Sequence, residues 1–366
     1  MRILLIAPID TKDRFRGGIS QYASTILSNN SNFWNSEIEF FPFNNCIVNR
    51  KPGTNGKLSF RNILNFFKTR KLLSRELKKN NYDAIYLNTS YGAALLKDLF
   101  TLKKKYKKKY KIFLHIHFAG FNNIFTKNIV ISKIIKKNIL SRTTNIISLS
   151  SQFKKELVLK GFDENKISVL YNYFDPMLPS INEDFIINKY KNINKPITFL
   201  FVGSLDQRKG FYDLIETFKN LNPDKINLAI CGKPNDYKSE YTLNEIKNNK
   251  IFNYYGYVSG NEKNNVFLKS NVLVLPSYAE GLPITILEAL NFGLPIISTN
   301  VGAIPEIIDE SIGILIKPGD LDGLRNTIAM FSNCNILKNT GINCLKQSKK
   351  YTFDEFSKNL INILKG

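Results

Sequence analysis

The chain has 366 residues, of which 43% are hydrophobic, and carries a formal net charge of +22. This length is sufficient for two α/β domains of about 150 residues each, and the hydrophobic fraction excludes a chain that is disordered throughout. Such a positive charge indicates an anionic partner, but composition alone does not decide among nucleic acid, an anionic membrane surface and phosphorylated substrates.

The cysteines and the first residues exclude several other classes. None of the four cysteines belongs to a CxxC pair or lies close to a histidine, which argues against a zinc site or a disulfide framework and fits a reducing cytoplasm. The opening MRILLIAP is interrupted by Pro8 and Asp10, so it predicts a first β-strand and not a signal peptide. No apolar run approaches the roughly 18 residues that span a bilayer, so we expect any membrane contact to be peripheral.

Short apolar runs alternate with helical patterns through the first half of the chain. Helices are predicted, for example, over 19–28 and 59–79. The predicted strands are Arg2–Ala7, Glu37–Pro42, Ala84–Asn88, Lys111–His117 and Asn145–Leu149. This alternation predicts a parallel, doubly wound sheet in a first domain over residues 1–175.

Residues 176–196 contain three prolines and little apolar periodicity, which predicts an inter-domain linker. A second α/β domain is expected over 197–350, and a C-terminal helix over 351–366 is expected to pack back on the first domain. The strands predicted here are Ile197–Gly203, Lys225–Cys231, Ile251–Tyr255, Val272–Leu275, Pro295–Thr299 and Ile314–Ile316. Two such halves facing across a cleft would bind ligands at the carboxyl ends of their strands.

The most informative stretch is NVLVLPSYAEGLPITILEALNFGLPIISTNVGAIPEII. A buried strand leads to the loop SYAEG and then to a helix with Pro283 near its first position. The N–H groups of Leu282 and Ile284, with the positive end of the helix dipole, would form an anion site. A diphosphate bound there would leave Glu288 within reach of a ribose diol and Glu280 within reach of a sugar hydroxyl.

This stretch resembles the signature of the retaining glycosyltransferase family 4, in which two glutamates lie eight residues apart in an EGLP…LEA…G.PII.T..G..PEI pattern. The resemblance implies the GT-B fold and a bacterial enzyme of surface-polysaccharide assembly. FVGSLDQRKGFYDLI also resembles the family, and it places Lys209 at the diphosphate-binding lysine. The family has arginine where this chain has Ser204, and we expect Arg208 to supply the missing charge. ISVLYNYFDP resembles the family's hinge segment, and we interpret it as structural.

In the first half, the run Arg16–Ile19 resembles the family's GG loop after the first strand, where glycine allows the backbone to approach a donor closely. The only histidines, His115 and His117, alternate at strand spacing, and we expect them to point to opposite faces. His117 is nearer the strand end, and the resemblance implies that it reaches the donor sugar. The predicted catalytic residues are His117 and Glu280. The predicted donor-binding residues are Gly17, Gly18, Gly203, Arg208, Lys209, Gly281, Leu282, Ile284 and Glu288.

No metal ion or cofactor is expected. Asp320-Leu321-Asp322 spells a DxD motif, but it follows a PGD turn in which Asp320 is expected to cap a helix. Lys209, Arg208 and helix N–H groups would then stabilise the departing diphosphate. The resemblance also implies front-side transfer with retention of configuration, and UDP is expected over GDP as the nucleotide.

The basic charge gathers in three segments of the first half, 57–79, 101–111 and 127–142, and two of these mix apolar with basic residues at helical spacing. Basic amphipathic helices favour anionic lipid surfaces. We therefore expect a cytoplasmic enzyme bound peripherally to the inner face of the membrane, with a lipid-linked oligosaccharide as acceptor. The alternative is a solvated lysine-rich surface.

Two other functions remain as alternatives. One is another nucleotide-sugar enzyme of the same fold, such as an epimerase or a phosphorylase. The other is a nucleic-acid-binding protein, which the charge alone favours, although no recognisable module accompanies it and no nucleic-acid partner is expected. The first strand is not followed by GxGxxG, which argues against a dehydrogenase.

Overall fold

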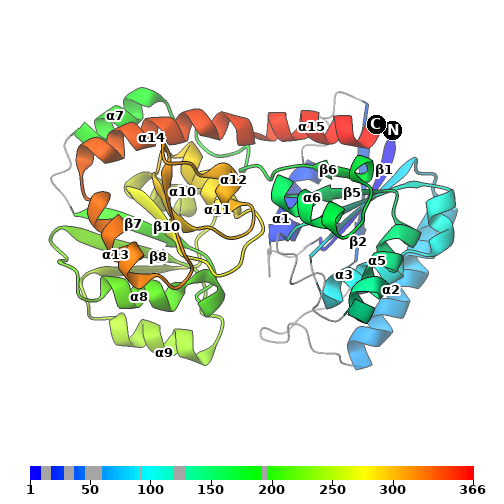
Figure 1. Ribbon diagram of the computed structural model, residues 1–366, viewed down its shortest axis with the longest axis horizontal. Coiled ribbons are helices and arrows are strands. Elements are labelled where there is room, and N and C mark those ends of the chain that lie inside the picture. The colour runs from blue at the N-terminus through cyan, green and yellow to red at the C-terminus, as the bar shows by residue number, and fades with distance from the viewer. Residues whose placement is uncertain (10–17, 29–36, 46–59, 91, 119–128, 192–195) are drawn as a thin grey trace. The chain divides into compact units, whose positions relative to one another are not determined.

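The computed structural model describes residues 1–9, 18–28, 37–45, 60–90, 92–118, 129–191 and 196–366. They form two compact units, one of Met1–Tyr171 with Asp354–Gly366 and one of Asn172–Phe353. Each unit is built around a parallel six-stranded sheet (Figure 1). Among these residues, no helix combines the length and hydrophobicity required to cross a membrane.

The first sheet has the strand order β2-β1-β3-β4-β5-β6. The elements of this part of the chain are β1 (Arg2–Ala7), α1 (Gly18–Ser28), β2 (Glu39–Asn44), α2 (Phe60–Lys79), β3 (Ala84–Thr89), α3 (Ala93–Thr101), η1 (Lys104–Lys108), β4 (Lys111–Ile116), α5 (Ile129–Arg142), β5 (Asn145–Ser148), α6 (Ser151–Leu159), η2 (Glu164–Lys166), β6 (Ile167–Val169) and the C-terminal α15 (Phe353–Lys365). Strands β1 to β5 lie within two residues of their predicted bounds. Strands of a parallel sheet are buried on both faces, so each one appears in the sequence as a continuous apolar run. β6 was not predicted.

α15 packs within the first unit. Its residues Phe356, Leu360 and Leu364 recur every four positions and are buried, which gives the helix one apolar face. The Phe356 ring meets Tyr22 of α1 edge-on with centroids 5.5 Å apart. Lys365 also forms an ion pair with Glu37. The last thirteen residues therefore belong structurally with the first half of the chain.

The second sheet has the strand order β12-β11-β10-β7-β8-β9. The elements of the second unit are α7 (Glu183–Lys191), β7 (Ile197–Val202), η3 (Gln207–Lys209), α8 (Phe211–Phe218), β8 (Ile226–Cys231), α9 (Tyr237–Ile246), β9 (Phe252–Gly256), α10 (Gly260–Lys269), β10 (Val272–Leu275), α11 (Ile284–Asn291), β11 (Ile296–Thr299), α12 (Ile304–Ile307), β12 (Gly313–Ile316), α13 (Leu321–Met330), α14 (Cys334–Ser348) and η4 (Lys349–Tyr351). All six strands were predicted to within two residues.

The segment 176–196 differs from its prediction, because α7 lies within it and packs on α14. Ile186 and Tyr190 are four residues apart and both buried, and the Tyr190 hydroxyl donates to the carbonyls of Asn271 and Gly293. Two buried side chains one helical turn apart suffice to hold a short helix against a neighbour, although they leave little periodicity in the sequence.

Both sheets reverse their strand order at one point, next to the first strand of each unit. In the first sheet β2 and β3 flank β1, and in the second sheet β8 and β10 flank β7. Open α/β sheets bind ligands outside the carboxyl ends of the strands at such a switch point. The loops after β7 and β10 are therefore where a ligand site of the second unit is expected.

Candidate functional site

Lys209 lies in the segment that follows β7, at the end of the short helix η3. The Asp206 carboxylate caps η3 by accepting from the backbone N–H of Lys209 at 3.0 Å, and it also accepts from Ser204 and Asn235. The next residue, Gly210, has φ of +71°, and a Cβ there would lie 2.1 Å from the carbonyl oxygen of Pro276. Only glycine fits this turn, which sets the Lys209 side chain against the loop after β10.

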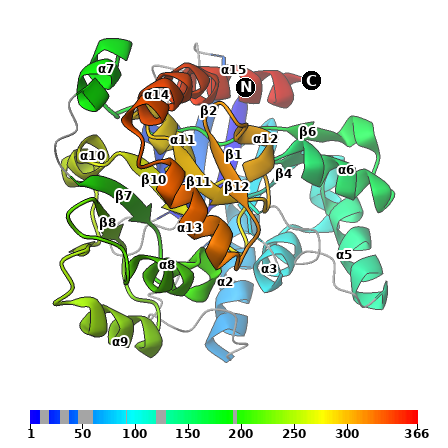
Figure 2. The ribbon, with the colours of Figure 1, turned by 60° about the vertical axis from the view of Figure 1, so that its left-hand side comes forward.

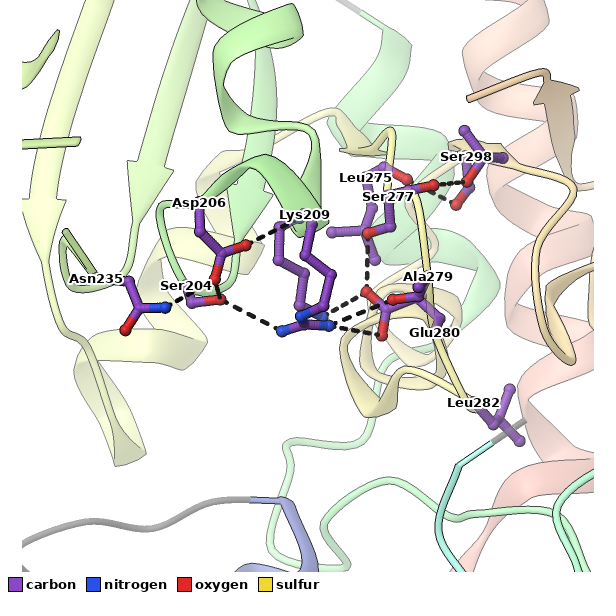
Figure 3. Close-up of polar contacts among 12 residues, drawn as sticks. Ser204, Asp206, Lys209, Asn235, Leu275, Ser277, Ala279, Glu280, Leu282 and Ser298 are labelled. Carbon is purple, nitrogen blue, oxygen red and sulfur yellow. Dashed lines mark hydrogen bonds and ion pairs between the residues drawn. The ribbon is translucent and has the colours of Figure 1, made fainter. Parts of the chain in front are cut away.

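Glu280 lies in the loop after β10 and is 6% exposed. Its Oε1 accepts from Lys209 Nζ at 2.5 Å and from the Ser277 hydroxyl at 2.8 Å (Figure 3). Gly302 packs directly against this loop and has φ of +60°. A Cβ at this position would lie 2.3 Å from the carbonyl oxygen of Glu280, so only glycine fits. Lys209 and Glu280, 71 residues apart in the chain, thus form one partly buried ion pair at the switch point.

Arg208 contacts the same loop as Lys209. Its Nη1 donates to the Ala279 carbonyl at 3.3 Å and lies 3.9 Å from Glu280 Oε2, and its Nη2 lies 3.5 Å from the Ser204 hydroxyl. The arginine is 43% exposed, so these contacts contribute little to stability. Its guanidinium nevertheless approaches the same carboxylate as the Lys209 ammonium. The family has an arginine at the position that Ser204 occupies in this chain.

The start of α11 follows this loop, and Pro283 is its N-cap residue, next to the first helical position as predicted. The backbone N–H groups of Leu282, Ile284 and Thr285 donate to no other group in the described part of the chain. Free N–H groups at a helix N-terminus attract anions. Asn172 holds the turn by donating to the Leu282 carbonyl at 2.8 Å.

Glu288 lies inside α11 and is only 1% exposed. Both of its carboxylate oxygens are within 2.7 Å of Lys263 Nζ, which comes from α10. Burial raises the pKa of the Glu288 carboxyl, and the Lys263 ammonium opposes part of that rise. Lys263 was not among the predicted site residues, because nothing in the spacing of α10 marks it as a partner for α11.

In the first unit, His115 and His117 lie on the same face, so the prediction of opposite faces was wrong. Side chains in a strand repeat every two residues, so positions 115 and 117 share a face, and their ring centroids are 4.0 Å apart. The Nδ1 of His115 is 2.6 Å from the Tyr86 hydroxyl, and the Nε2 of His117 is 2.7 Å from Asn88 Oδ1. Burial lowers the pKa of His117 to about 3 and lowers that of His115 well below its usual value.

The glycines predicted to bind the donor fall in three places. Gly17 lies outside the described residues, and Gly18 is the first residue of α1 after β1. Gly203 follows β7, and the Lys209 stem passes over it, since a Cβ there would lie 3.5 Å from Lys209 Cδ. Gly281 follows Glu280 and accepts from Ala303 N–H at 2.9 Å.

The Asp320 prediction is confirmed, since its carboxylate accepts from the N–H of Gly323 at 2.8 Å and caps α13. Within the described ranges, no three His, Cys, Asp or Glu side chains gather as metal ligands would.

Two family models match the chain over most of its length. Residues 182–347 match the model described as "Glycosyl transferases group 1", and residues 35–177 match "Glycosyltransferase Family 4". The chain belongs to glycosyltransferase family 4. This confirms the family that the sequence pattern predicted, and it identifies the chain as a glycosyltransferase.

Curated relatives are similar over much of the chain. A Klebsiella pneumoniae protein named "Uncharacterized 41.2 kDa protein in cps region" is 29% identical over 265 residues, which cover 70% of this chain and 71% of that protein. The Escherichia coli UDP-Gal:alpha-D-GlcNAc-diphosphoundecaprenol alpha-1,3-galactosyltransferase is 27% identical over 286 residues, which cover 74% and 72%. The Methanocaldococcus jannaschii protein named "Uncharacterized glycosyltransferase MJ1607" is 26% identical over 232 residues, which cover 60% of this chain and 59% of that protein.

Solved structures of similar shape confirm the GT-B fold. The lipopolysaccharide outer core galactosyltransferase WaaB has a TM-score of 0.68 at 20% identity, covering 100% of this chain and 99% of that chain. Anabaena Alr3699/HepE, solved with UDP, has a TM-score of 0.73 at 15% identity and is covered completely.

Proposed function

We propose that this glycosyltransferase takes its sugar from a nucleoside-diphosphate donor, whose diphosphate binds beside Lys209 at the start of α11. The observation that carries the proposal is the convergence of the Lys209 ammonium, the Arg208 guanidinium and the free N–H groups of α11 on one loop. Fixed positive groups of this kind stabilise the charge that develops on a departing diphosphate. In this proposal they do so without a metal ion.

The two glutamates then have separate roles. Glu280 Oε1 is occupied by Lys209 and Ser277, which leaves Oε2 to accept a hydroxyl of the donor sugar. Glu288, held by Lys263, accepts the ribose diol. His117 contacts the donor sugar, and transfer proceeds from the front side with retention of configuration.

The donor nucleotide in this proposal is UDP, and the acceptor is a lipid-linked oligosaccharide of a surface polysaccharide such as capsule or O-antigen. The names of two similar proteins support it. The Escherichia coli relative is named for UDP-Gal and a diphosphoundecaprenol-linked sugar, and the Klebsiella pneumoniae relative comes from a cps region.

Peripheral attachment to the inner face of an anionic membrane is proposed for one helical layer of the first unit. α3 packs against both α2 and α5, and these helices lie together in Figure 2. Apolar side chains are exposed on all three, at Phe67 (58%), Leu72 (37%), Phe100 (36%), Ile134 (49%) and Leu140 (42%). Exposed lysines flank them, including Lys71, Lys133 and Lys137, which is the composition that binds anionic lipid.

A donor screen tests the proposed reaction. Nucleotide release is measured with UDP- and GDP-sugars and a lipid-linked acceptor, and the product anomer is read by NMR. Activity that persists in EDTA, a UDP-sugar donor and a retained anomeric configuration support the proposal. Release that requires an added metal, or binding of short RNA that UDP does not displace, would contradict it.

Vesicle co-sedimentation at physiological salt tests the membrane surface. Phe67→Ser with Ile134→Ser is expected to lower recovery with anionic vesicles, whereas Leu159→Ser, an 85% exposed leucine on α6, is the matched control and is expected to leave recovery unchanged. Equal recovery of the wild type with neutral and anionic vesicles would refute the attachment.

A further inference from the structure

Four polar side chains line one face of the first sheet near the ends of β3 and β4. The parallel register places Asn88 beside His115, and the backbone N–H of His117 continues the ladder by donating to the Thr89 carbonyl at 2.8 Å. Because side chains repeat every two residues, Tyr86 and Asn88 face the same side as the two histidines. Asn88 is completely buried among them.

The amide of Asn88 has only one favourable orientation. Its Nδ2 donates to the Tyr86 carbonyl, although the distance of 3.4 Å is long, while its Oδ1 faces His117 Nε2 at 2.7 Å. If the amide turned over, its oxygen would face the Tyr86 carbonyl oxygen, and two acceptors would oppose each other. The oxygen therefore points at His117, so the proton between them must be carried by Nε2.

His117 is neutral near pH 7, because burial lowers its pKa to about 3. A neutral imidazole protonated on Nε2 has a lone pair on Nδ1. Within the described part of the chain, Nδ1 has no hydrogen-bonding partner, and His117 is not fully buried. The ring centroids of His115 and Tyr22 lie 4.0 and 4.5 Å from that of His117, so both rings restrict the rotation of the imidazole.

We propose that Asn88 is a positioning residue that keeps His117 protonated on Nε2, so that Nδ1 accepts a hydrogen bond from one hydroxyl of the donor sugar. The contact with the sugar rests on the proposed function, whereas the proton position does not. The proposal defines a donor class, because a sugar that lacks the contacted hydroxyl leaves Nδ1 without a donor. Losing one such hydrogen bond costs about tenfold in kcat/KM.

The proton position is measured by long-range ¹H–¹⁵N NMR at pH 7.5. The chain has two histidines, and His117→Gln assigns their signals. We expect His117 to be protonated on Nε2 in the wild type and in Asn88→Asp, whose carboxylate can only accept, and to become a mixture of tautomers in Asn88→Ala. The control is Asn45→Ala, another buried asparagine of this unit, which donates to Asp98 at 3.0 Å and is expected to leave the signals unchanged.

A wild-type His117 protonated on Nδ1 would overturn the proposal, and so would an Asn88→Ala spectrum identical to that of the wild type. Neither measurement requires a substrate, so the result is independent of whether the proposed transfer reaction is correct.

Kinetics with donors that each lack one hydroxyl test the sugar contact. His117→Ala and Asn88→Ala are each expected to lower kcat/KM about tenfold with the intact donor, and the double variant no further than His117→Ala alone. With one deoxy donor the loss is expected to disappear. If every deoxy donor retained the full loss, the sugar contact would be refuted, and if no nucleotide sugar supported transfer, the proposed function would fail while the NMR result stood.

Discussion

The two candidate glutamates of the second unit pair with lysines, whereas the two histidines of the first unit make neutral hydrogen bonds. Lys209, which follows β7, pairs with Glu280, which follows β10, and Lys263 of α10 pairs with Glu288 of α11. At the ends of β3 and β4, His117 instead meets the Asn88 amide, and burial lowers the pKa of both histidines. Fixed positive charge suits a diphosphate, whereas neutral groups that exchange hydrogen bonds suit hydroxyls.

The largest effect is expected from Lys209→Ala, which removes the positive charge beside Glu280 at the carboxyl ends of β7 and β10. We expect kcat to fall by about 10² to 10³, the usual cost of losing one group that stabilises developing charge. The measurement is nucleotide release at saturating donor. Lys219→Ala is the matched control, because Lys219 forms an exposed pair with Glu216 outside the site. Wild-type turnover in Lys209→Ala would show that the Lys209 ammonium does not serve catalysis.

Lys263→Met should show whether the second charged pair is also structural. Removing this ammonium leaves the Glu288 carboxylate buried and unpaired, and since Lys263 is 20% exposed we expect a loss of about 2 kcal/mol in the free energy of unfolding at pH 7. Because burial raises the pKa of Glu288, protonation relieves the penalty, so the loss should be smaller at pH 5. Denaturant unfolding at both pH values measures it, and an equal loss at both would contradict a charged Glu288.

The buried His117 of the first unit predicts that the free energy of unfolding falls at acid pH. The folded pKa of His117 is lowered to about 3, below its unfolded value, so its stabilising contribution is present above pH 6.5 and is lost as the pH falls. Between pH 7 and pH 5 this amounts to up to about 2 kcal/mol. His117→Gln should flatten the decline in the free energy of unfolding over this range by that amount, and a variant with the wild-type slope would show that His117 titrates normally.

The smallest effect is expected from Arg208→Ala. Arg208 is 43% exposed and 3.9 Å from Glu280, so we expect no measurable change in stability and a rise in KM for the donor of a few-fold. Initial rates over a range of donor concentrations measure it. A fall in kcat as large as that of Lys209→Ala would mean that Arg208 takes the role of the arginine that the family has at position 204.

Much of the fold followed from local patterns. Apolar runs bounded by turn residues predicted eleven of the twelve strands, because a buried parallel strand requires a continuous apolar run. β6 has only three residues and α7 buries only two side chains, so neither produced a pattern strong enough to predict. The prediction for the histidines was wrong because residues i and i+2 of a strand lie on the same face, so His115 and His117 cannot point to opposite faces.

The sequence by itself determined the family, the glutamates eight residues apart and the lysine after the first strand of the second unit, because these lie in short segments whose order and spacing are local. Only the tertiary structure showed that Lys209 contacts Glu280, that Lys263 contacts Glu288 and that Asn88 contacts His117. These contacts join residues 25 to 71 positions apart. Such distances depend on which strands become neighbours in the sheet, and neighbouring strands are chosen by packing of the whole unit and not by any local signal.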